Sequence, residues 1–123
     1  MSIQNHFELN VYKTSYSLAM EIYNLSKHYP KHELYSLTDQ IRRSSRSICA
    51  NIAEAWRFRT YPNSFSHKLN IAEAEVAETM TWLDFSKDCK YLNESDHKNI
   101  ISKYKHVLSM IVKMKTNPNQ WKI

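Results

Sequence analysis

Glycine is absent from all 123 residues of this chain. Without glycine there is no glycine-rich phosphate cradle, no dinucleotide-binding fingerprint and no type I′ hairpin of the Asn-Gly kind, because each depends on backbone conformations or close approaches that glycine allows. Proline is also scarce, with three residues. Long stretches are instead rich in good helix formers. The composition therefore predicts an all-α protein and argues against the classical nucleotide-binding folds.

Paired cysteines, metal-ligand motifs and long apolar runs are also missing. Cys49 and Cys89 lie far apart in apolar helical stretches, which favours reduced thiols and a cytoplasmic location over a disulfide or metal site. The six histidines include no H-E-x-x-H motif, and Glu94 to His97 is the one Glu-x-x-His pair, where helix capping is a sufficient role. No window approaches the ~18 apolar residues of a membrane span, and no signal peptide is recognisable. We expect a soluble protein without metal, cofactor or membrane contact.

The formal charge of +5 and the pI near 9.2 are unevenly distributed along the chain. Residues 37–59 carry five arginines against two carboxylates, whereas residues 62–92 carry five carboxylates against three lysines. Opposite charge on consecutive segments favours their packing against each other. The remaining basic surface is compatible with nucleic acid, although many basic proteins bind none.

Apolar periodicity and helix-ending residues predict four helices joined by short turns. The predicted helices cover about residues 6–28, 37–59, 62–90 and 94–115, and Trp121 falls on a short C-terminal tail. Pro30 closes the first helix, Pro62 opens the third, and Asn93 caps the fourth. This pattern predicts one domain over residues 1–123, folded as an antiparallel up-down-up-down four-helix bundle. The apolar face of the first helix is wide enough to contact two helices or another subunit.

Two polar lines accompany the apolar positions of the central segments. Ser44, Ser47, Asn51 and Glu54 follow one side of the second helix, and Glu75 with Glu78 lies between apolar neighbours on the third. Carboxylates that are partly shielded from water need partners. We expect a structural polar seam in which the second helix, through Asn51 or its arginines, faces the carboxylates of the third. Its members are Asn51, Glu54, Glu75 and Glu78.

The basic residues of the central region admit two interpretations. They are candidates for phosphate contact, because arginines and lysines at helical spacing can follow a nucleic-acid backbone as a basic strip. They are equally compatible with ion pairs to Glu75, Glu78 and Asp84, within the chain or between subunits. Trp56 and Phe58 would stack on bases in the first case and clamp the adjacent helix in the second. The candidate nucleic-acid-binding residues are Arg42, Arg43, Arg46, Arg57, Arg59 and Lys68.

One stretch resembles a known family. The segment Gln40–Trp56, with Phe65 to Ala72 and Glu75 to Thr79 behind it, is similar to the signature of bacterial four-helix bundle proteins linked to intervening sequences of 23S ribosomal RNA genes, also labelled S23 ribosomal proteins. The similarity extends over roughly Phe7 to Ile111. Arg42 and Arg43 match the basic pair of the family, and Asn51 and Glu54 match its Asn-Ile-Ala-Glu quartet. This chain has Ala55 and Glu75 where the commonest form has glycine and serine.

The resemblance implies a homopentameric ring of four-helix bundles. It also implies kinship with accessory variability determinant proteins of diversity-generating retroelements, which bind nucleic acid and a reverse transcriptase. No established activity comes with the intervening-sequence branch itself.

Three hypotheses follow from the sequence. The first is a non-enzymatic oligomer that binds RNA or DNA through a basic surface, with a reverse transcriptase as a further partner in a retroelement context. The second is an assembly module whose partner is a protein and whose arginines lie in subunit interfaces. The third is an enzyme with a carboxylate-rich site inside the bundle, and this hypothesis requires tightly bound metal. A serine nucleophile is not indicated, because the sequence has no G-x-S-x-G motif. We do not expect catalysis.

Overall fold

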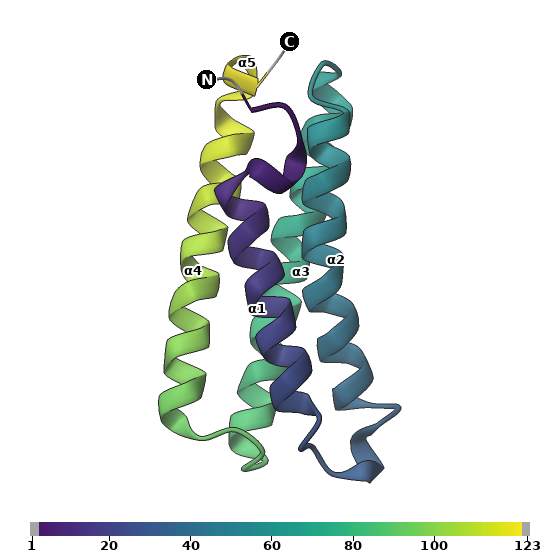
Figure 1. The fold of residues 1–123 in the computed structure, drawn as a ribbon, viewed down its shortest axis with the longest axis vertical. Helices are drawn as coiled ribbons and strands as arrows, with labels where there is room; N and C mark the ends of the chain where they lie inside the picture. Colours follow the sequence, from purple (N-terminus) through teal and green to yellow (C-terminus); the bar gives the residue numbers. More distant parts are fainter. Residues whose placement is uncertain (1–2, 122–123) are drawn as a thin grey trace.

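Four long helices run up and down beside one another in the computed structural model, which describes residues 3–121 (Figure 1). No strand occurs in that range. The helices are α1 (Asn10–Ser26), α2 (Leu37–Arg57), α3 (Pro62–Asp88) and α4 (Glu94–Thr116), accompanied by short turns η1 (His6–Glu8), η2 (Lys31–Glu33) and α5 (Pro118–Trp121). Each long helix packs on the next, and α1 also packs on α4, so α2 and α4 occupy opposite corners. The predicted all-α four-helix bundle is confirmed.

One apolar core runs the length of the bundle between the four helices. Its centre is formed by residues that are fully or almost fully buried: Leu18, Ile22, Ile41, Ile48, Ile52, Leu69, Val76, Ile100 and Tyr104. These positions recur at four- and seven-residue spacing within each helix, which places them on one face. No helix among residues 3–121 combines the length and apolar character that a membrane span requires.

The helix ends differ from the predicted ones by a few residues. The first helix begins at Asn10 because Leu9 is extended, and the preceding residues form the separate turn η1. The third helix ends at Asp88, and Lys90 follows with a φ of 69°. This left-handed conformation normally favours glycine. Since the chain has no glycine, a lysine accepts the steric cost at this helix end.

Trp121 was predicted to lie on a short C-terminal tail, and the structure shows where that tail packs. Trp121 packs against the core, and its ring meets the Trp56 ring edge to face, with 6.2 Å between centroids. The short helix α5 begins at Pro118 and brings the indole back over the end of α2.

A tyrosine cluster ties together the two connections at the end of the bundle opposite the chain termini (Figure 1). The Tyr29 hydroxyl donates to Ser86 Oγ at 2.7 Å, and the Tyr91 hydroxyl donates to Glu33 Oε2 at 2.9 Å. The two tyrosine rings lie 5.3 Å apart between centroids. The link between α1 and α2 is thereby fixed against the link between α3 and α4.

Candidate nucleic-acid interface

The central helix α2 sorts its side chains into faces. Ile41, Ile48 and Ile52 point into the core and are fully buried. On the side that faces α3, Ser44 is buried and its Oγ accepts a hydrogen bond of 2.8 Å from Thr79 Oγ1. The arginines occupy the remaining surface, toward α1 and toward solvent. The helix can therefore present charge outward without disturbing the core.

Arg42 is half-buried and contacts the neighbouring helix. Its Nε donates to Ser26 Oγ of α1 at 2.8 Å, and its guanidinium carbon lies 4.9 Å from the centre of the Tyr23 ring. Serine 26 is buried. Arg42 therefore links α2 to α1. A phosphate bound at Arg42 would have to share the guanidinium group with Ser26 and Tyr23.

Arg43, Arg46 and Arg57 are the exposed arginines of the candidate set. The guanidinium carbon of Arg46 lies 5.6 Å from the centre of the Tyr23 ring. By helical rise, Arg46 and Arg57 are separated by about 16 Å. The side chains between them on the outer surface include Ala50 and Ala53, so the structure divides the expected strip into two basic regions with a small apolar segment between them.

Arg59 closes the end of α2. Its Nη1 donates to the Trp56 carbonyl oxygen at 2.8 Å, and its guanidinium carbon lies 4.1 Å from the Trp56 ring centre. The Trp56 side chain is buried, with 6% of its surface exposed, and is covered from another side by Trp121. Trp56 is thus a packing residue of the bundle, whereas Phe58 is partly exposed.

The residues of the expected polar seam make other contacts than the expected ones. Glu54 is exposed and forms an ion pair of 2.7 Å with Lys68 of α3. Asn51 bonds within its own helix, with Nδ2 donating to the Ser47 carbonyl at 2.9 Å and to Ser47 Oγ at 3.1 Å. The links from α2 to α3 along this line include the Glu54–Lys68 ion pair, the hydroxyl bond from Thr79 to Ser44, and an interaction of Ser47 with Glu75.

Glu75 and Glu78 lie next to each other on α3. Burial raises the pKa of Glu75, and the nearby Glu78 charge adds to the increase. The three ion pairs among the described residues join Lys68 to Glu54, His97 to Asp84 and Lys115 to Glu73. None of them uses an arginine. The predicted pairing of the α2 arginines with Glu75, Glu78 or Asp84 does not occur within the described part of the chain.

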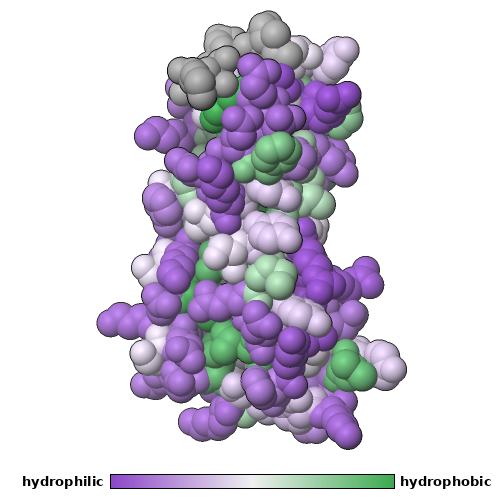
Figure 2. All heavy atoms as spheres, viewed as in Figure 1, coloured by the Kyte–Doolittle hydropathy of each residue, from purple (hydrophilic) through white to green (hydrophobic). Residues whose placement is uncertain are grey.

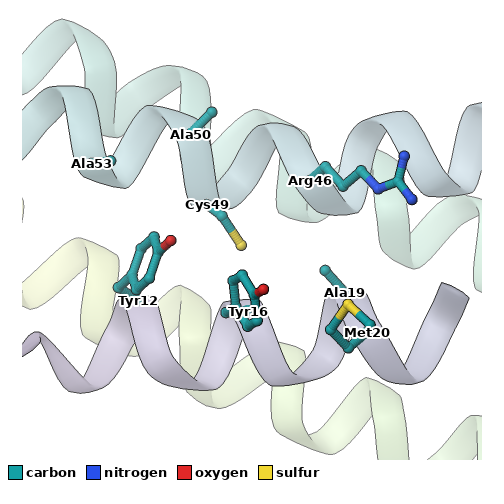
Figure 3. Close-up of a pocket in the computed structure, with 8 residues that line it drawn as sticks. All are labelled: Tyr12, Tyr16, Ala19, Met20, Arg46, Cys49, Ala50 and Ala53. Carbon is teal, nitrogen blue, oxygen red and sulfur yellow. The ribbon is translucent and has the colours of Figure 1, made fainter. Parts of the chain in front are cut away.

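An apolar groove of about 380 Å³ lies between α1 and α2. Figure 3 shows Tyr12 and Tyr16 of α1 facing Cys49 of α2 across it, with Arg46 toward one end. Tyr16 is 54% exposed and Met20 is 44% exposed. The wide apolar face predicted for the first helix therefore has a part that its own bundle leaves uncovered.

Metal-ligating side chains are dispersed. Within residues 3–121, no three side chains of His, Cys, Asp or Glu gather closely enough to hold a metal ion. In the single Glu-x-x-His match, Glu94 lies in the first turn of α4, and His97 Nε2 lies 2.8 Å from Asp84 Oδ1. Asn93 caps this helix, as predicted, by accepting from the Asp96 backbone N–H at 2.7 Å.

The outer face of α4 is also basic, and its lysines were not among the predicted site residues. Lys98, Lys105 and Lys113 are all exposed there. The signal in the sequence is the absence of any Asp or Glu after Asp96.

Comparison with known proteins connects this geometry to a family. The sequence model of the family described as "23S rRNA-intervening sequence protein" matches residues 7–113. Among solved structures, a protein of unknown function from the S23 ribosomal protein family of Bacteroides thetaiotaomicron is similar, with 29% identity and a TM-score of 0.78 over 87% of this chain and 96% of that chain. No curated protein matches the chain. These similarities agree with the resemblance drawn from the Gln40–Trp56 segment.

Proposed function

The chain belongs to the 23S rRNA-intervening sequence protein family, and we propose that it is a non-enzymatic, oligomeric protein that binds the backbone of RNA or DNA. The proposal rests on the exposure of Arg43, Arg46 and Arg57 and on their lack of ion-pair partners among the described residues. These arginines are exposed on α2, and no ion pair described between residues 3 and 121 involves them.

Arginine is suited to this role because its planar guanidinium can bind phosphate through two parallel hydrogen bonds. Arg43 and Arg57 lie about 21 Å apart along α2. Neutralising several phosphates at once releases condensed counterions, which favours binding at low salt. The overall charge of +5 adds long-range attraction for a polyanion.

The uncovered groove between α1 and α2 supports self-association as the second part of the proposal. Its exposed aromatic and methionine side chains favour burial, and Ala50 and Ala53 permit close approach by another helix. We propose that a second copy of the chain covers this groove. Because Arg46 lines one end of it, Arg46 would lie at the edge of that contact, and Arg43 and Arg57 would remain free to contact phosphate. The family resemblance makes a homopentameric ring the expected assembly.

A second candidate function is supported by the carboxylates of α3. Glu75 and Glu78 are adjacent and take part in none of the described ion pairs. If the arginines of α2 met these carboxylates on a neighbouring subunit, the protein would be an assembly module without nucleic-acid affinity. Arginine enrichment is typical of both kinds of interface.

The deciding experiment compares the unsubstituted protein with R43Q/R46Q/R57Q and with a control, K13Q/K31Q/K87Q, that removes the same charge elsewhere. Fluorescence anisotropy with a short structured RNA, repeated from about 50 to 200 mM salt, measures the salt slope of binding. We expect the arginine variant to lower the slope by about 0.9 per lost phosphate contact and the control to change it less. Light scattering on the same samples gives the assembly mass. An unsubstituted protein that binds neither RNA nor DNA at low salt, together with arginine variants that dissociate, would favour the assembly function.

A further inference from the structure

The last part of the chain, after Asp96, carries basic side chains and no acidic ones. From His97 to the C-terminus the sequence contains six lysines and no Asp or Glu. Most of these lysines belong to α4, whose acidic residues, Glu94 and Asp96, are confined to its first turn. There they stabilise the positive end of the helix dipole. The rest of α4 must find its counter-charges on other elements or outside the molecule.

The bundle supplies counter-charges to the edge of α4 that faces α3. His97 lies 2.8 Å from Asp84, and Lys115 Nζ lies 2.7 Å from Glu73 Oε1. The outward lysines take part in none of the ion pairs described for residues 3–121. On the face seen in Figure 2, hydrophilic side chains project along the edge that α4 forms in Figure 1.

The outward lysines share one face of the helix. Lys98, Lys105 and Lys113 are seven and eight residues apart, which is close to two helical turns in each case. They extend over about 22 Å, and a double helix presents about 13 phosphates over that length. Ser102 and Ser109 lie between them and are exposed. Lysine and serine side chains are common donors to phosphate oxygens.

The same face offers no Phe, Tyr or Trp side chain on which a base could stack. Tyr104 is the one such residue of α4, and it is fully buried in the core, whereas the ring exposed beside the lysines is the imidazole of His106. Proteins that bind single strands place aromatic side chains where bases can stack on them. A surface made mainly of lysines and serines matches the regular phosphate rows of a duplex better than the unpaired bases of a single strand.

We propose that the outer face of α4 is a second nucleic-acid contact, specific for the backbone of a double helix and formed by Lys98, Lys105 and Lys113. This inference rests on the proposed function and extends it, because α4 lies at the corner of the bundle opposite α2. Another subunit that covers the groove between α1 and α2 would leave α4 exposed. Duplex binding at α4 is therefore possible whether the α2 arginines contact phosphate or lie in a subunit interface.

The test uses full-length K98Q/K105Q/K113Q, with K13Q/K31Q/K87Q as the charge-matched control and K98R/K105R/K113R as the charge-preserving variant. Glutamine and arginine have helix propensities near that of lysine, so far-UV circular dichroism should remain unchanged. The probes are an RNA duplex of about 20 base pairs, a DNA duplex of the same sequence and an unstructured single strand of the same length. Anisotropy titrations at several salt concentrations give the affinity and the salt slope for each probe.

We expect the glutamine variant to bind at least one duplex more than tenfold more weakly than the control does at about 0.1 M salt, with a salt slope smaller by about 2 to 3. The arginine variant should retain duplex binding, and the RNA and DNA arms identify which duplex is held. Equal duplex affinities for the glutamine variant and the control would overturn the α4 contact, as would tighter binding of the single strand by the unsubstituted protein. If R43Q/R46Q/R57Q then still lost binding, the proposed function would stand without α4. An unsubstituted protein that binds none of the probes would overturn both proposals.

Discussion

Replacing Arg59 with alanine removes two contacts that Arg57, two residues earlier, does not make. The first is the hydrogen bond of 2.8 Å from Nη1 to the Trp56 carbonyl, and the second is the guanidinium stacked 4.1 Å from the indole centre. Because Arg59 is partly exposed, the hydrogen bond contributes about 1 kcal/mol and the cation–π contact about 0.5–1 kcal/mol. We expect Arg59→Ala to lower the free energy of unfolding by about 1.5–2 kcal/mol, or Tm by about 4–8 °C. Arg57→Ala should change it by less than about 0.5 kcal/mol.

Urea and thermal unfolding followed by circular dichroism measure both variants under the same conditions. The two substitutions remove the same charge from the same end of α2, so each is the control for the other. Nucleic-acid binding should show the opposite order, with Arg57→Ala reducing the salt slope by about 0.9 and Arg59→Ala reducing it less. Equal loss of stability in the two variants would refute the structural role assigned to Arg59.

Three further predictions concern single side chains. Lys90→Gly should raise the free energy of unfolding by up to about 1 kcal/mol, because glycine adopts the left-handed conformation without steric cost. Thermal unfolding would show this as a higher Tm, and a lower Tm would contradict it. The pKa of Glu75 is raised in the folded protein, so at pH values just above the ordinary glutamate pKa the folded protein binds more protons than the unfolded chain does. The free energy of unfolding should therefore fall as the pH rises from the ordinary glutamate pKa to the raised one. Glu75→Gln should flatten this dependence in urea titrations between about pH 4 and 6, and an unchanged profile would show that Glu75 is not the titrating group. Burial raises the pKa of Cys49 to about 11, so iodoacetamide at neutral pH should modify the exposed Cys89 first and Cys49 only after denaturation, as mass spectrometry would reveal.

The fold was predictable because its signals are local. The spacing of Ile41, Ile48 and Ile52 placed one face of α2 in the core, and all three are fully buried. Pro62 and Asn93 marked helix starts correctly because a ring-locked φ and a side-chain cap act within a single turn. These features depend on neighbouring residues alone, and tertiary packing strengthens them.

The contacts of the candidate site were less predictable because they join residues that are distant in sequence. Arg42 bonds to Ser26 across the turn between α1 and α2, and Lys68 reaches Glu54 across the next turn. Neither partner follows from periodicity, which fixes the face of a helix and leaves open which neighbouring side chain is reached. The packing of Trp121 on Trp56 was not predicted for the same reason, since it depends on the docking of the chain end.

The even number of helices has a mechanical consequence, because it brings both chain ends to one end of the bundle while Tyr29 and Tyr91 fasten the other (Figure 1). A load applied between the two ends pulls α1 and α4 apart in an unzipping geometry, in which contacts break one layer at a time rather than shearing together. Resistance to such a load is therefore set by the single layer under tension and not by the whole core. The tyrosine cluster lies farthest from the point of loading, so it should be the last layer to yield in a single-molecule pulling experiment.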